Sequence, residues 1–176
     1  ILLTGGPCAG KSTSMSTLQE FLTNHGFVVF TVPEAATLLI MQGGFKPSLA
    51  TLPIFQKAIT ATQHALEKAY FEYAQEIQPS YGKPIVILID RGIMEGAAYV
   101  NAKLFDRILK HALHTEQEID TTALLNSKYD LILHLVTAAI GAETFYQNEV
   151  FRGESMEDAI ALDKRLQDVY KTHKHR

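Results

Sequence analysis

The sequence predicts an α/β fold in which a mostly parallel β-sheet is flanked by helices in three layers. Stretches typical of strands alternate with stretches typical of helices, and this order favours parallel strands joined by right-handed helical crossovers. Two of the predicted strands are almost continuous apolar runs, as expected for strands that are buried on both faces. A glycine-rich turn joins the first strand directly to the first helix, which is the third observation behind the prediction.

The first part of the chain contains two predicted strands and one helix. Residues 1–3 are a short apolar run that leads into glycines. Residues 12–25 carry apolar side chains at helical spacing, and Gly26 follows at a position where a left-handed cap is favoured. Residues 27–32 are apolar except for one threonine and rich in β-branched and aromatic types, and Pro33 ends this strand.

The middle of the chain contains a short helix, a long helix and the third strand. Residues 35–42 predict the short helix, and Thr51 can cap the long one, whose apolar stripe continues to about Gln78. The sequence Pro-Ser-Tyr-Gly at 79–82 predicts a turn. Residues 85–89 are five apolar residues in a row, which predicts a buried strand.

The last part of the chain contains three helices and the fourth strand. Helices are predicted over 102–114 and 116–126, followed by a strand over 129–136. Ser155 starts the last helix, with Asp158 three residues later at the capping-box position. The residues themselves therefore predict four strands.

Length, charge and cysteine content limit the classes of protein to which the chain can belong. Its 176 residues suit one domain over 1–176, and its single cysteine excludes an internal disulfide. A net charge of -3 argues against a nucleic-acid partner, and no apolar run approaches the roughly 18 residues of a membrane span. The seven histidines form no metal-binding pattern, and His134 is expected as a satisfied core histidine. The chain opens on Ile1 and closes on Arg176 in a basic stretch, so we expect trimmed ends and further residues or a domain in the full-length protein.

A phosphate-binding loop is predicted between the first strand and the first helix. The segment GGPCAGKS at 5–12 fits the pattern G-x-x-x-x-G-K-[ST], with a strand before it and a helix after it. Glycines allow backbone angles that side chains would block, so successive backbone N–H groups can surround anionic oxygens. The start of the following helix adds partial positive charge. The expected nucleotide-binding residues are Gly5, Gly6, Pro7, Cys8, Ala9, Gly10, Lys11, Ser12 and Thr13.

Three side chains of this loop carry specific expectations. Lys11 supplies a point charge for the β- and γ-phosphates, and the Ser12 hydroxyl is placed to bind Mg²⁺. Cys8 is a small residue that fills the loop or, alternatively, a redox-sensitive thiol that the helix start activates. The pattern predicts ATP or GTP as the bound nucleotide, together with Mg²⁺.

An acid and an arginine end the third predicted strand. In a fold with a phosphate loop, an acid at this place can hold Mg²⁺, so Asp90 is the second expected metal ligand beside Ser12. Arg91 could clamp a phosphate through two parallel hydrogen bonds. The alternative for this pair is a local ion pair at the strand end.

Two further residues are candidates for catalysis. Glu34 follows the second strand, and ligands of open α/β sheets bind beyond the carboxyl ends of the strands, so Glu34 could take a proton from a substrate hydroxyl. The alternative for Glu34 is a favourable charge at the start of the next helix. Arg152, in a polar stretch before the last helix, resembles a lid arginine that closes over transferring phosphate; the alternative is a solvated loop arginine.

Four segments of the chain together resemble one known family. They are, in chain order, 5–12 (GGPCAGKS), 33–37 (PEAAT), 90–92 (DRG) and 134–139 (HLVTAA). They resemble the AAA-like phosphate-loop domain shared by the nicotinamide-riboside kinase domain of bacterial NadR and the animal TRPL translocation defect protein. The likeness is nearer to the second of these and covers nearly the whole chain.

This resemblance implies nucleotide binding, a kinase-like sheet of about five strands and a cytoplasmic location. Members of the animal branch are understood to bind GTP and phosphoinositides and to carry a second, triphosphate-tunnel-like domain after this one. Ile140 departs from the family, in which an acid tends to follow Thr-Ala-Ala, so the resemblance assigns no role that needs this acid.

A looser resemblance links the chain to deoxynucleoside kinases. In that family these positions hold the catalytic base, an acid–arginine pair, a Phe-Gln that reads the base and an Arg-Gly lid. The matching positions here are Pro33-Glu34, Asp90-Arg91, Phe55-Gln56 and Arg152-Gly153. The resemblance implies that Gln56 hydrogen-bonds a substrate amide, and the alternative is an ordinary exposed glutamine.

Two functions remain open at this point. The first is Mg²⁺-dependent phosphoryl transfer from ATP or GTP to a small hydroxyl-bearing acceptor. Its catalytic residues would be Lys11, Glu34, Asp90, Arg91 and Arg152, and its substrate contacts Glu34, Gln56 and Arg91. The second is a GTP-responsive binding module whose partner is a phosphoinositide or a protein, with peripheral membrane association. Its basic surface would be formed by Lys164, Arg165, Lys171, Lys174 and Arg176, together with His173 and His175.

Overall fold

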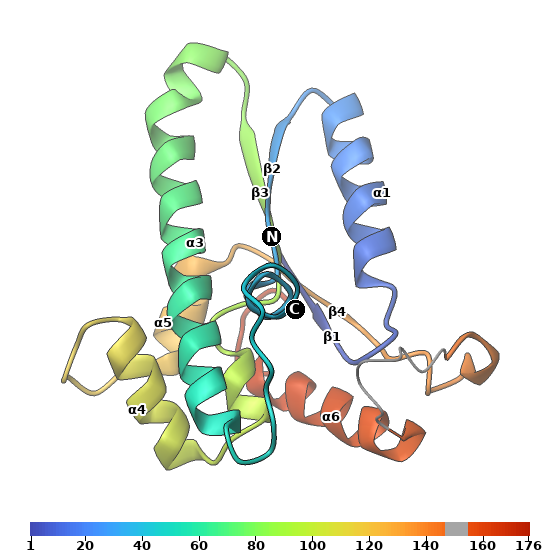
Figure 1. Cartoon of the computed structure of the whole chain (residues 1–176). Coiled ribbons are helices and arrows are strands. Elements are labelled where there is room, and N and C mark those ends of the chain that lie inside the picture. The colour runs from blue at the N-terminus through green and yellow to red at the C-terminus, as the bar shows by residue number, and fades with distance from the viewer. Residues whose placement is uncertain (147–154) are drawn as a thin grey trace.

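A four-stranded parallel sheet forms the centre of the molecule (Figure 1). The computed structural model describes residues 1–146 and 155–176. The strands are β1 (Leu2–Gly5), β2 (Val28–Val32), β3 (Ile85–Asp90) and β4 (Ile132–Leu135). Their order is β2-β3-β1-β4, and all three neighbouring pairs are parallel. The predicted α/β class with a parallel sheet is confirmed. The described residues hold the four strands that the apolar runs predict, and not the about five that the family resemblance implies.

The helices connect the strands and cover the sheet. They are α1 (Lys11–Asn24), α2 (Ala35–Thr37), α3 (Leu52–Tyr81), α4 (Ala102–Ala112), α5 (Thr121–Lys128) and α6 (Met156–Val169). A π-helix η1 (Leu38–Gln42) continues α2, and two 3₁₀ turns are η2 (Glu95–Ala98) and η3 (Glu143–Phe145). None of the helices in the described part of the chain has the length and apolar composition needed to span a membrane.

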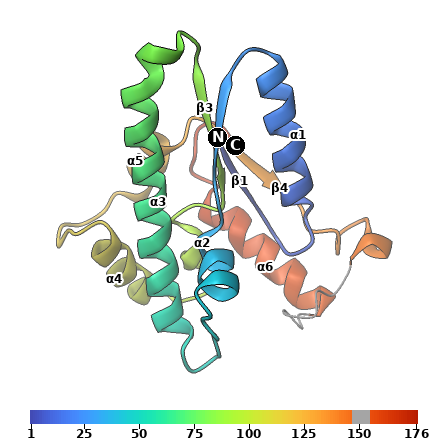
Figure 2. The ribbon, with the colours of Figure 1, turned by 45° about the horizontal axis from the view of Figure 1, so that its top comes forward.

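The two faces of the sheet bury different cores because successive side chains of a strand point to opposite faces. Leu3 and Leu88 pack on one face with Met15 of α1. Leu2 and Ile89 pack on the other, with residues of α4, α5 and the end of α6, and α3 contributes partly buried side chains there. In both ribbon views α1 lies on one side of the sheet and α3 on the other (Figures 1 and 2). The molecule therefore has the predicted three layers.

Two helix boundaries differ by more than two residues from the predictions, and the strand predicted over 129–136 covers only Ile132–Leu135. The expected helix over 116–126 begins only at Thr121, because the Asp120 side chain accepts a hydrogen bond from Ala123 N and so starts the helix there. The expected turn at 79–82 is instead the last turn of α3, and Gly82 follows it with φ of 59°. Because proline has no amide hydrogen, Pro79 removes one helical hydrogen bond from the last turn of α3, and the turn still forms. The left-handed Gly82 then ends the helix.

Helix caps follow the sequence at two of three predicted positions. Gly26 adopts φ of 90° after α1, as predicted. The Ser155 hydroxyl accepts from Asp158 N at 3.1 Å and starts α6, as predicted. Thr51 makes no side-chain cap to α3, because its hydroxyl accepts from Ser48 N at 2.9 Å in the preceding turn. At Thr51 the hydrogen bonds of the preceding turn therefore form in place of a side-chain cap.

The carboxyl ends of the strands lie together at one edge of the sheet. The register pairs Gly5 with Leu135, Leu3 with Asp90, and Val32 with Ile89. The segments that leave these strands therefore start side by side, as expected for parallel strands. This edge is where the sequence places the phosphate loop and the candidate acids.

Candidate functional site

The phosphate loop has a backbone that only certain residues tolerate. Gly5 has φ of 146° and Gly10 has φ of 73°, both in the region that favours glycine. A Cβ atom on Gly5 would lie 2.0 Å from the carbonyl oxygen of Leu135, so the close pairing of β1 with β4 also requires glycine there. Cys8 adopts a positive φ of 53° without being glycine, which marks a strained point in the loop.

The start of α1 faces out of the loop. Its first helical hydrogen bond runs from Ser14 N to Gly10 O, so the amides before Ser14 are the ones that an α-helix start leaves without helical partners. Gly10, Ser12 and Thr13 are exposed. Amides and positive helix-end charge at one exposed place are what an anionic phosphate needs.

Lys11 folds back over the loop. Its Nζ donates to the carbonyl oxygens of Gly5 at 3.0 Å and Gly6 at 2.9 Å. Burial and the nearby Arg91 lower the pKa of Lys11 to about 8. The ammonium group thus lies in surroundings that disfavour its charge, and an arriving phosphate would reverse this.

The second rim of the site is a chain of charged groups that starts from the end of β3. Arg91, with φ of 62°, places its Nε 2.8 Å from Glu34 Oε1 and one terminal nitrogen 2.6 Å from Glu95 Oε2. The Thr4 hydroxyl donates to Glu95 Oε1 at 2.6 Å. Arg91 thus forms a local ion pair with Glu95 at the strand end and a second ion pair with Glu34, and no ion pair joins it to Asp90 in the described part of the chain.

The charge states of this rim follow from those contacts. Burial lowers the pKa of Arg91, but Glu95, Tyr99 and Glu34 outweigh it and hold that pKa well above its usual value. Arg91 therefore stays charged beside Glu34. Glu34 makes no side-chain cap to α2, and its Oε2 accepts from the Thr37 hydroxyl at 2.7 Å. Its carboxylate thus contacts both Arg91 on the rim and Thr37 in the first turn of α2.

Asp90 lies on this edge with an unused oxygen. Its Oδ1 is buried and has no hydrogen-bond partner among the described residues. Burial and the neighbouring Glu34 raise the pKa of Asp90. A buried acceptor in this state fits a cation as its missing partner.

These donors fit Mg²⁺, which binds protein through one or two oxygens and completes its shell with phosphate and water. Ser12 and Asp90 are the residues that would hold it. No group of three or more His, Cys, Asp or Glu side chains that could hold a metal occurs in residues 1–146 and 155–176. The described residues therefore do not form a metal site that consists of protein side chains alone.

Gln56 lies inside the protein and not on its surface. The residue is 5% exposed on α3, so the alternative of an ordinary exposed glutamine is wrong. A Cβ atom on Gly96 would lie 3.3 Å from its Oε1 and 2.9 Å from Phe105. The amide group thus packs against η2, which directly follows the Arg91 segment. Arg152, the predicted lid arginine, lies outside the described residues.

The sequence reasoning missed three buried carboxylates around the site. Glu95 stands four residues after Arg91, a spacing that often marks a side-chain pair, so this signal was available. Asp163 of α6 accepts from Gly6 N at 2.9 Å, across 157 positions of sequence. Glu67 of α3 pairs with Lys128 at 2.9 Å. The last two leave no mark in local spacing, because their partners come from other elements.

Glu67 belongs to a network that reaches both rim segments. Tyr129 donates its hydroxyl to Glu67 at 3.1 Å and accepts from Ile93 N at 3.3 Å, two residues beyond Arg91. Gln63 donates to Glu67 at 3.4 Å and accepts from Ala35 N at 3.1 Å, one residue beyond Glu34. One buried carboxylate on α3 is thereby linked to the segments that carry Glu34 and Arg91.

Other predicted features lie away from the charged rim or are otherwise engaged. His134 contacts Asp163 at 3.1 Å through Nε2, but its buried Nδ1 has no hydrogen-bond partner among the described residues, so this core histidine is only half satisfied. In the predicted basic surface, Arg165 donates to Ala98 O, Arg176 donates to Gln167 O, and Lys171 pairs with Asp168. Lys164 and Lys174 are exposed.

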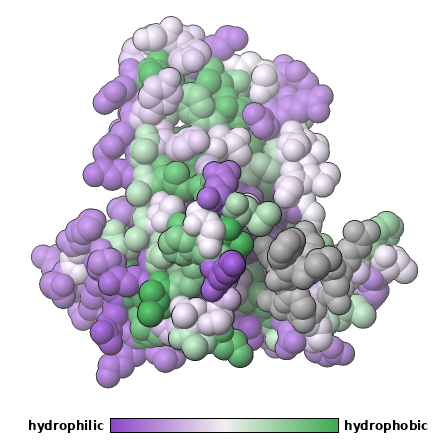
Figure 3. Space-filling view, viewed as in Figure 1, coloured by the Kyte–Doolittle hydropathy of each residue, from purple (hydrophilic) through white to green (hydrophobic). Residues whose placement is uncertain are grey.

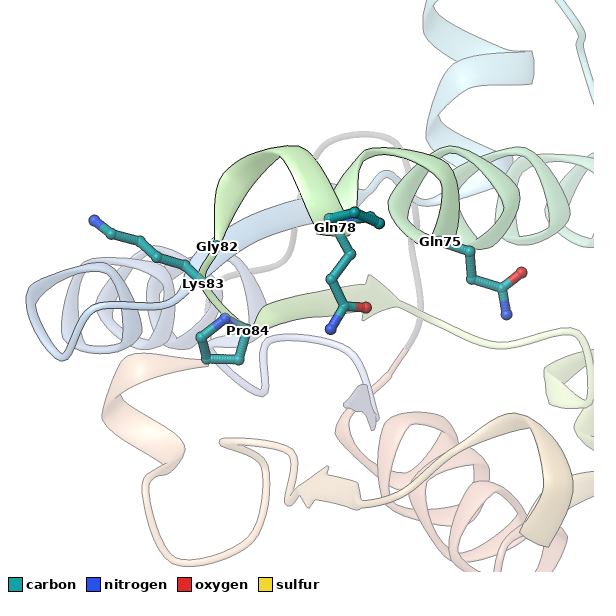
Figure 4. A pocket seen from close by; sticks show the side chains of 6 residues that line it. Gln75, Gln78, Gly82, Lys83 and Pro84 are labelled. Carbon is teal, nitrogen blue, oxygen red and sulfur yellow. The ribbon is translucent and has the colours of Figure 1, made fainter.

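The open pockets differ in their relation to the site. A pocket of about 530 Å³ lies where α3 meets β3, at the amino ends of the strands and so at the opposite edge from the phosphate loop. Its side chains do not converge, since Lys83 points away from Gln78 (Figure 4). A smaller pocket of about 180 Å³ between the loop after η1 and α3 includes Phe45, Ile54 and Phe55.

Apolar surface surrounds this smaller pocket. Figure 3 shows hydrophobic surface gathered in the middle of this face and hydrophilic surface mainly toward its edges. Met41, Phe45, Leu49 and Ile54 are exposed by 65%, 44%, 93% and 72%. These four exposed residues lie along the chain between Glu34 and Gln56.

Comparisons with known proteins agree with this arrangement. A family model described as an AAA domain matches residues 1–176. Among the solved structures, the chain is similar to deoxyadenosine kinase from M. mycoides with bound dATP. The TM-score is 0.54, the sequence identity is 17%, and the match covers 97% of this chain and 82% of that one. At this identity the likeness shows a shared fold. No curated protein matches the chain.

Proposed function

We propose a function from one premise: the chain belongs to the AAA domain family, whose model matches residues 1–176. The function is Mg²⁺-dependent binding of ATP or GTP, with phosphoryl transfer to a hydroxyl group of a small acceptor. The observation that carries it is the pairing of a phosphate loop with a charged rim on the neighbouring strand. Arg91 N donates to Leu3 O at 3.0 Å, so the rim begins beside the strand that leads into the loop.

The nucleotide half of the proposal uses the loop and Lys11. The backbone amides at the start of α1 would hold phosphate oxygens, and Lys11 would contribute the point charge. Ser12 and Asp90 would hold Mg²⁺, which when bound neutralises charge on the phosphates. The lowered pKa of Lys11 supports this. Burial disfavours the positive charge of this side chain, and a bound phosphate would stabilise that charge.

The acceptor half uses Glu34, Arg91 and Gln56. Glu34 would take the proton of the acceptor hydroxyl as its oxygen attacks the terminal phosphorus, and the bond to the bridging oxygen of the nucleotide would break. Arg91, which carries charge beside Glu34, would stabilise the negative charge on the transferring group. The buried amide of Gln56 would read an amide edge on the acceptor, such as that of a nucleobase or a nicotinamide.

Two resemblances support the acceptor class. Four segments of the chain resemble nicotinamide-riboside kinases and the TRPL translocation defect protein, and a deoxyadenosine kinase shares the fold. A nucleoside-like acceptor with a primary hydroxyl is consistent with both kinases. A cytoplasmic location would suit such an activity.

A thermal-shift panel with ATP, GTP, ADP and GDP, each with and without Mg²⁺, tests the binding. A ligand that binds only the folded state stabilises it by RT ln(1 + [L]/Kd), about 2.7 kcal/mol at one hundred times Kd. Lys11→Ala should weaken binding about tenfold or more, because it removes a charge-assisted contact to phosphate. Wild-type affinity in Lys11→Ala, measured by calorimetry, would overturn the phosphate-loop assignment. Lys57→Ala, at an exposed lysine on α3, is the matched control.

The reaction needs its own test. Purified protein with Mg²⁺ and the preferred nucleotide is incubated with a panel of nucleosides and ribosyl compounds, and phosphorylated products are detected by mass spectrometry. Glu34→Gln should lose turnover while keeping nucleotide affinity, because the amide cannot accept the proton. Unchanged turnover in Glu34→Gln would remove Glu34 as the base. No product from any acceptor would defeat the kinase proposal.

A GTP-responsive binding module is the second candidate. The exposed Lys164 and Lys174 near the end of α6 are the observation that favours it, because anionic headgroups bind exposed cations. Co-sedimentation with phosphoinositide-containing vesicles, with and without Mg²⁺-GTP, tests this candidate. Retained binding after Lys164→Ala and Lys174→Ala would exclude that surface.

A further inference from the structure

Asp163 is a fully buried carboxylate on α6 that the proposed phosphoryl chemistry does not use. Its Oδ1 accepts from Gly6 N at 2.9 Å and from Thr137 N at 3.2 Å. The same oxygen lies 3.1 Å from His134 Nε2, and Oδ2 accepts from Gln167 at 2.9 Å. One side chain thus joins the phosphate loop, the segment after β4 and α6.

The chemistry of these contacts makes the carboxylate hard to replace. An ionised carboxylate only accepts, so His134 must donate through Nε2. The buried Nδ1 of His134 has no hydrogen-bond partner among the described residues. A buried carboxylate is costly unless donors surround it, and here the donors come from three separate elements.

The loop is shaped around this carboxylate. A Cβ atom on Gly6 would lie 2.8 Å from Asp163 Oδ1 and 3.1 Å from the Cβ of Thr137, so the loop backbone is in direct contact with both residues. Thr137 adds a second link, since its hydroxyl donates to Pro7 O at 2.5 Å. The loop is therefore held along two consecutive residues, Gly6 and Pro7, by contacts within the protein.

The geometry points to Asp163 as a positioning residue that holds the phosphate loop in its phosphate-binding shape by fastening it to α6 and to the segment after β4. A loop that is already ordered loses less conformational freedom when a nucleotide binds, so the clamp raises affinity. This effect on affinity rests on the proposed function, whereas the clamp itself does not.

Hydrogen exchange of the nucleotide-free protein tests the clamp directly. The variants are Asp163→Ala, Asp163→Asn and the control Asp168→Asn, which alters an exposed aspartate on α6 paired only with the exposed Lys171 in the salt bridges of the structure. In Asp163→Ala, peptides covering residues 1–14 should exchange about tenfold faster or more, because buried amides lose their acceptor. Asp163→Asn keeps one acceptor oxygen and should give a smaller increase at the same place.

The control Asp168→Asn should match wild type. Loop exchange that is unchanged in Asp163→Ala, or that rises equally in α3 peptides, would overturn the clamp, because the residue would then be merely structural. If Asp163→Ala does not fold, Asp163→Asn decides: a rise confined to the loop supports the clamp, and wild-type exchange overturns it.

Nucleotide affinity provides the second readout. Calorimetry with Mg²⁺-ATP and Mg²⁺-GTP should show about tenfold weaker binding in Asp163→Ala, an intermediate loss in Asp163→Asn and wild-type binding in Asp168→Asn. Wild-type affinity in a folded Asp163→Ala would overturn the positioning role. Failure of the wild-type protein to bind either nucleotide would instead defeat the proposed function, and loop exchange would still decide the clamp.

Discussion

Lys11 carries the clearest pH signature of any single residue in the site. Burial, together with Arg91, lowers the pKa of its ammonium from 10.5 to about 8. Between these values the unfolded chain binds more protons than the folded one, so this residue makes stability rise with pH across that window. A bound phosphate would raise the pKa again, which couples nucleotide binding to a proton.

We therefore predict that nucleotide binding takes up protons at pH 8 to 9. Above pH 8 the affinity should fall, by at most about tenfold per pH unit for one proton. Calorimetry in two buffers of different ionisation enthalpy measures the uptake. Lys57→Met, which alters an exposed lysine, should leave the uptake unchanged. Binding without proton exchange across pH 7 to 9 would contradict the prediction.

Asp90 combines a stability cost with a functional role. Its pKa is raised by burial and by Glu34, so the folded protein loses stability as pH rises from 3.8 through the higher folded value. Asp90→Asn removes that loss, and we expect the nucleotide-free protein to melt about 2–4 °C higher at neutral pH. The same variant should lose the Mg²⁺ dependence of nucleotide affinity while keeping Mg²⁺-free binding.

Differential scanning calorimetry and titrations in EDTA and in Mg²⁺ measure both effects of Asp90→Asn. The melting difference should shrink at low pH, where the wild-type carboxyl is protonated. A variant that melts lower than wild type, or that responds to Mg²⁺ as wild type does, would show that Asp90 is a structural acid.

At the scale of elements, α3 does more than cover the sheet. Its Glu67 is completely buried, and its pKa is raised by burial despite the pairing with Lys128. Through Gln63 and Tyr129 it reaches the amides next to the two rim segments. The helix thus carries structural support for both Glu34 and Arg91.

Glu67→Ala should cost about 3–5 kcal/mol in the free energy of unfolding, because it leaves Lys128 without its buried partner. The double variant Glu67→Met/Lys128→Met should cost less than Glu67→Ala, since it removes both charges together. Urea unfolding measures both. Glu72→Ala, in the exposed pair with Lys68 on the same helix, should change little. Equal effects of Glu67→Ala and Glu72→Ala would rule out the buried network as a support.

The element boundaries show which features of the fold can be predicted from sequence patterns and which cannot. The strand and helix order followed from apolar runs and periodicity, which depend on neighbouring residues. Competing local signals decided two boundaries. They set the start of α5 at Thr121 and the extension of α3 through Pro79. Ser155 and Gly26 gave correct ends because each acts on the backbone next to it.

At the scale of the whole molecule, the residues after α6 return to the sheet and to α5. His173 is buried, and its Nε2 donates to Tyr129 O at 2.8 Å while its Nδ1 accepts from His175 N at 3.1 Å. Ile132 N of β4 donates to His175 O at 2.9 Å. The two ends of the described chain lie near each other as a result (Figure 2).

His173→Ala should lower the free energy of unfolding by about 1–3 kcal/mol, because the carbonyl of Tyr129 loses a buried partner. Denaturant unfolding measures the loss. His175→Ala is the control, since the contact of His175 with β4 uses its backbone and its side chain is exposed. The prediction fails if both variants unfold at the same denaturant concentration.

The sequence by itself determined the α/β order, the phosphate loop and the residues that leave each strand, because each depends on consecutive residues. It also placed Lys11, Glu34 and Asp90 on one edge, since parallel strands share the direction of their carboxyl ends. Only the tertiary structure decided which groups meet there. The pairing of Arg91 with Glu34 and the grip of Asp163 on Gly6 join residues far apart in the chain, and the order β2-β3-β1-β4 with α6 beside β1 creates both contacts. Local spacing carries no trace of such contacts, because they arise only when separate elements pack.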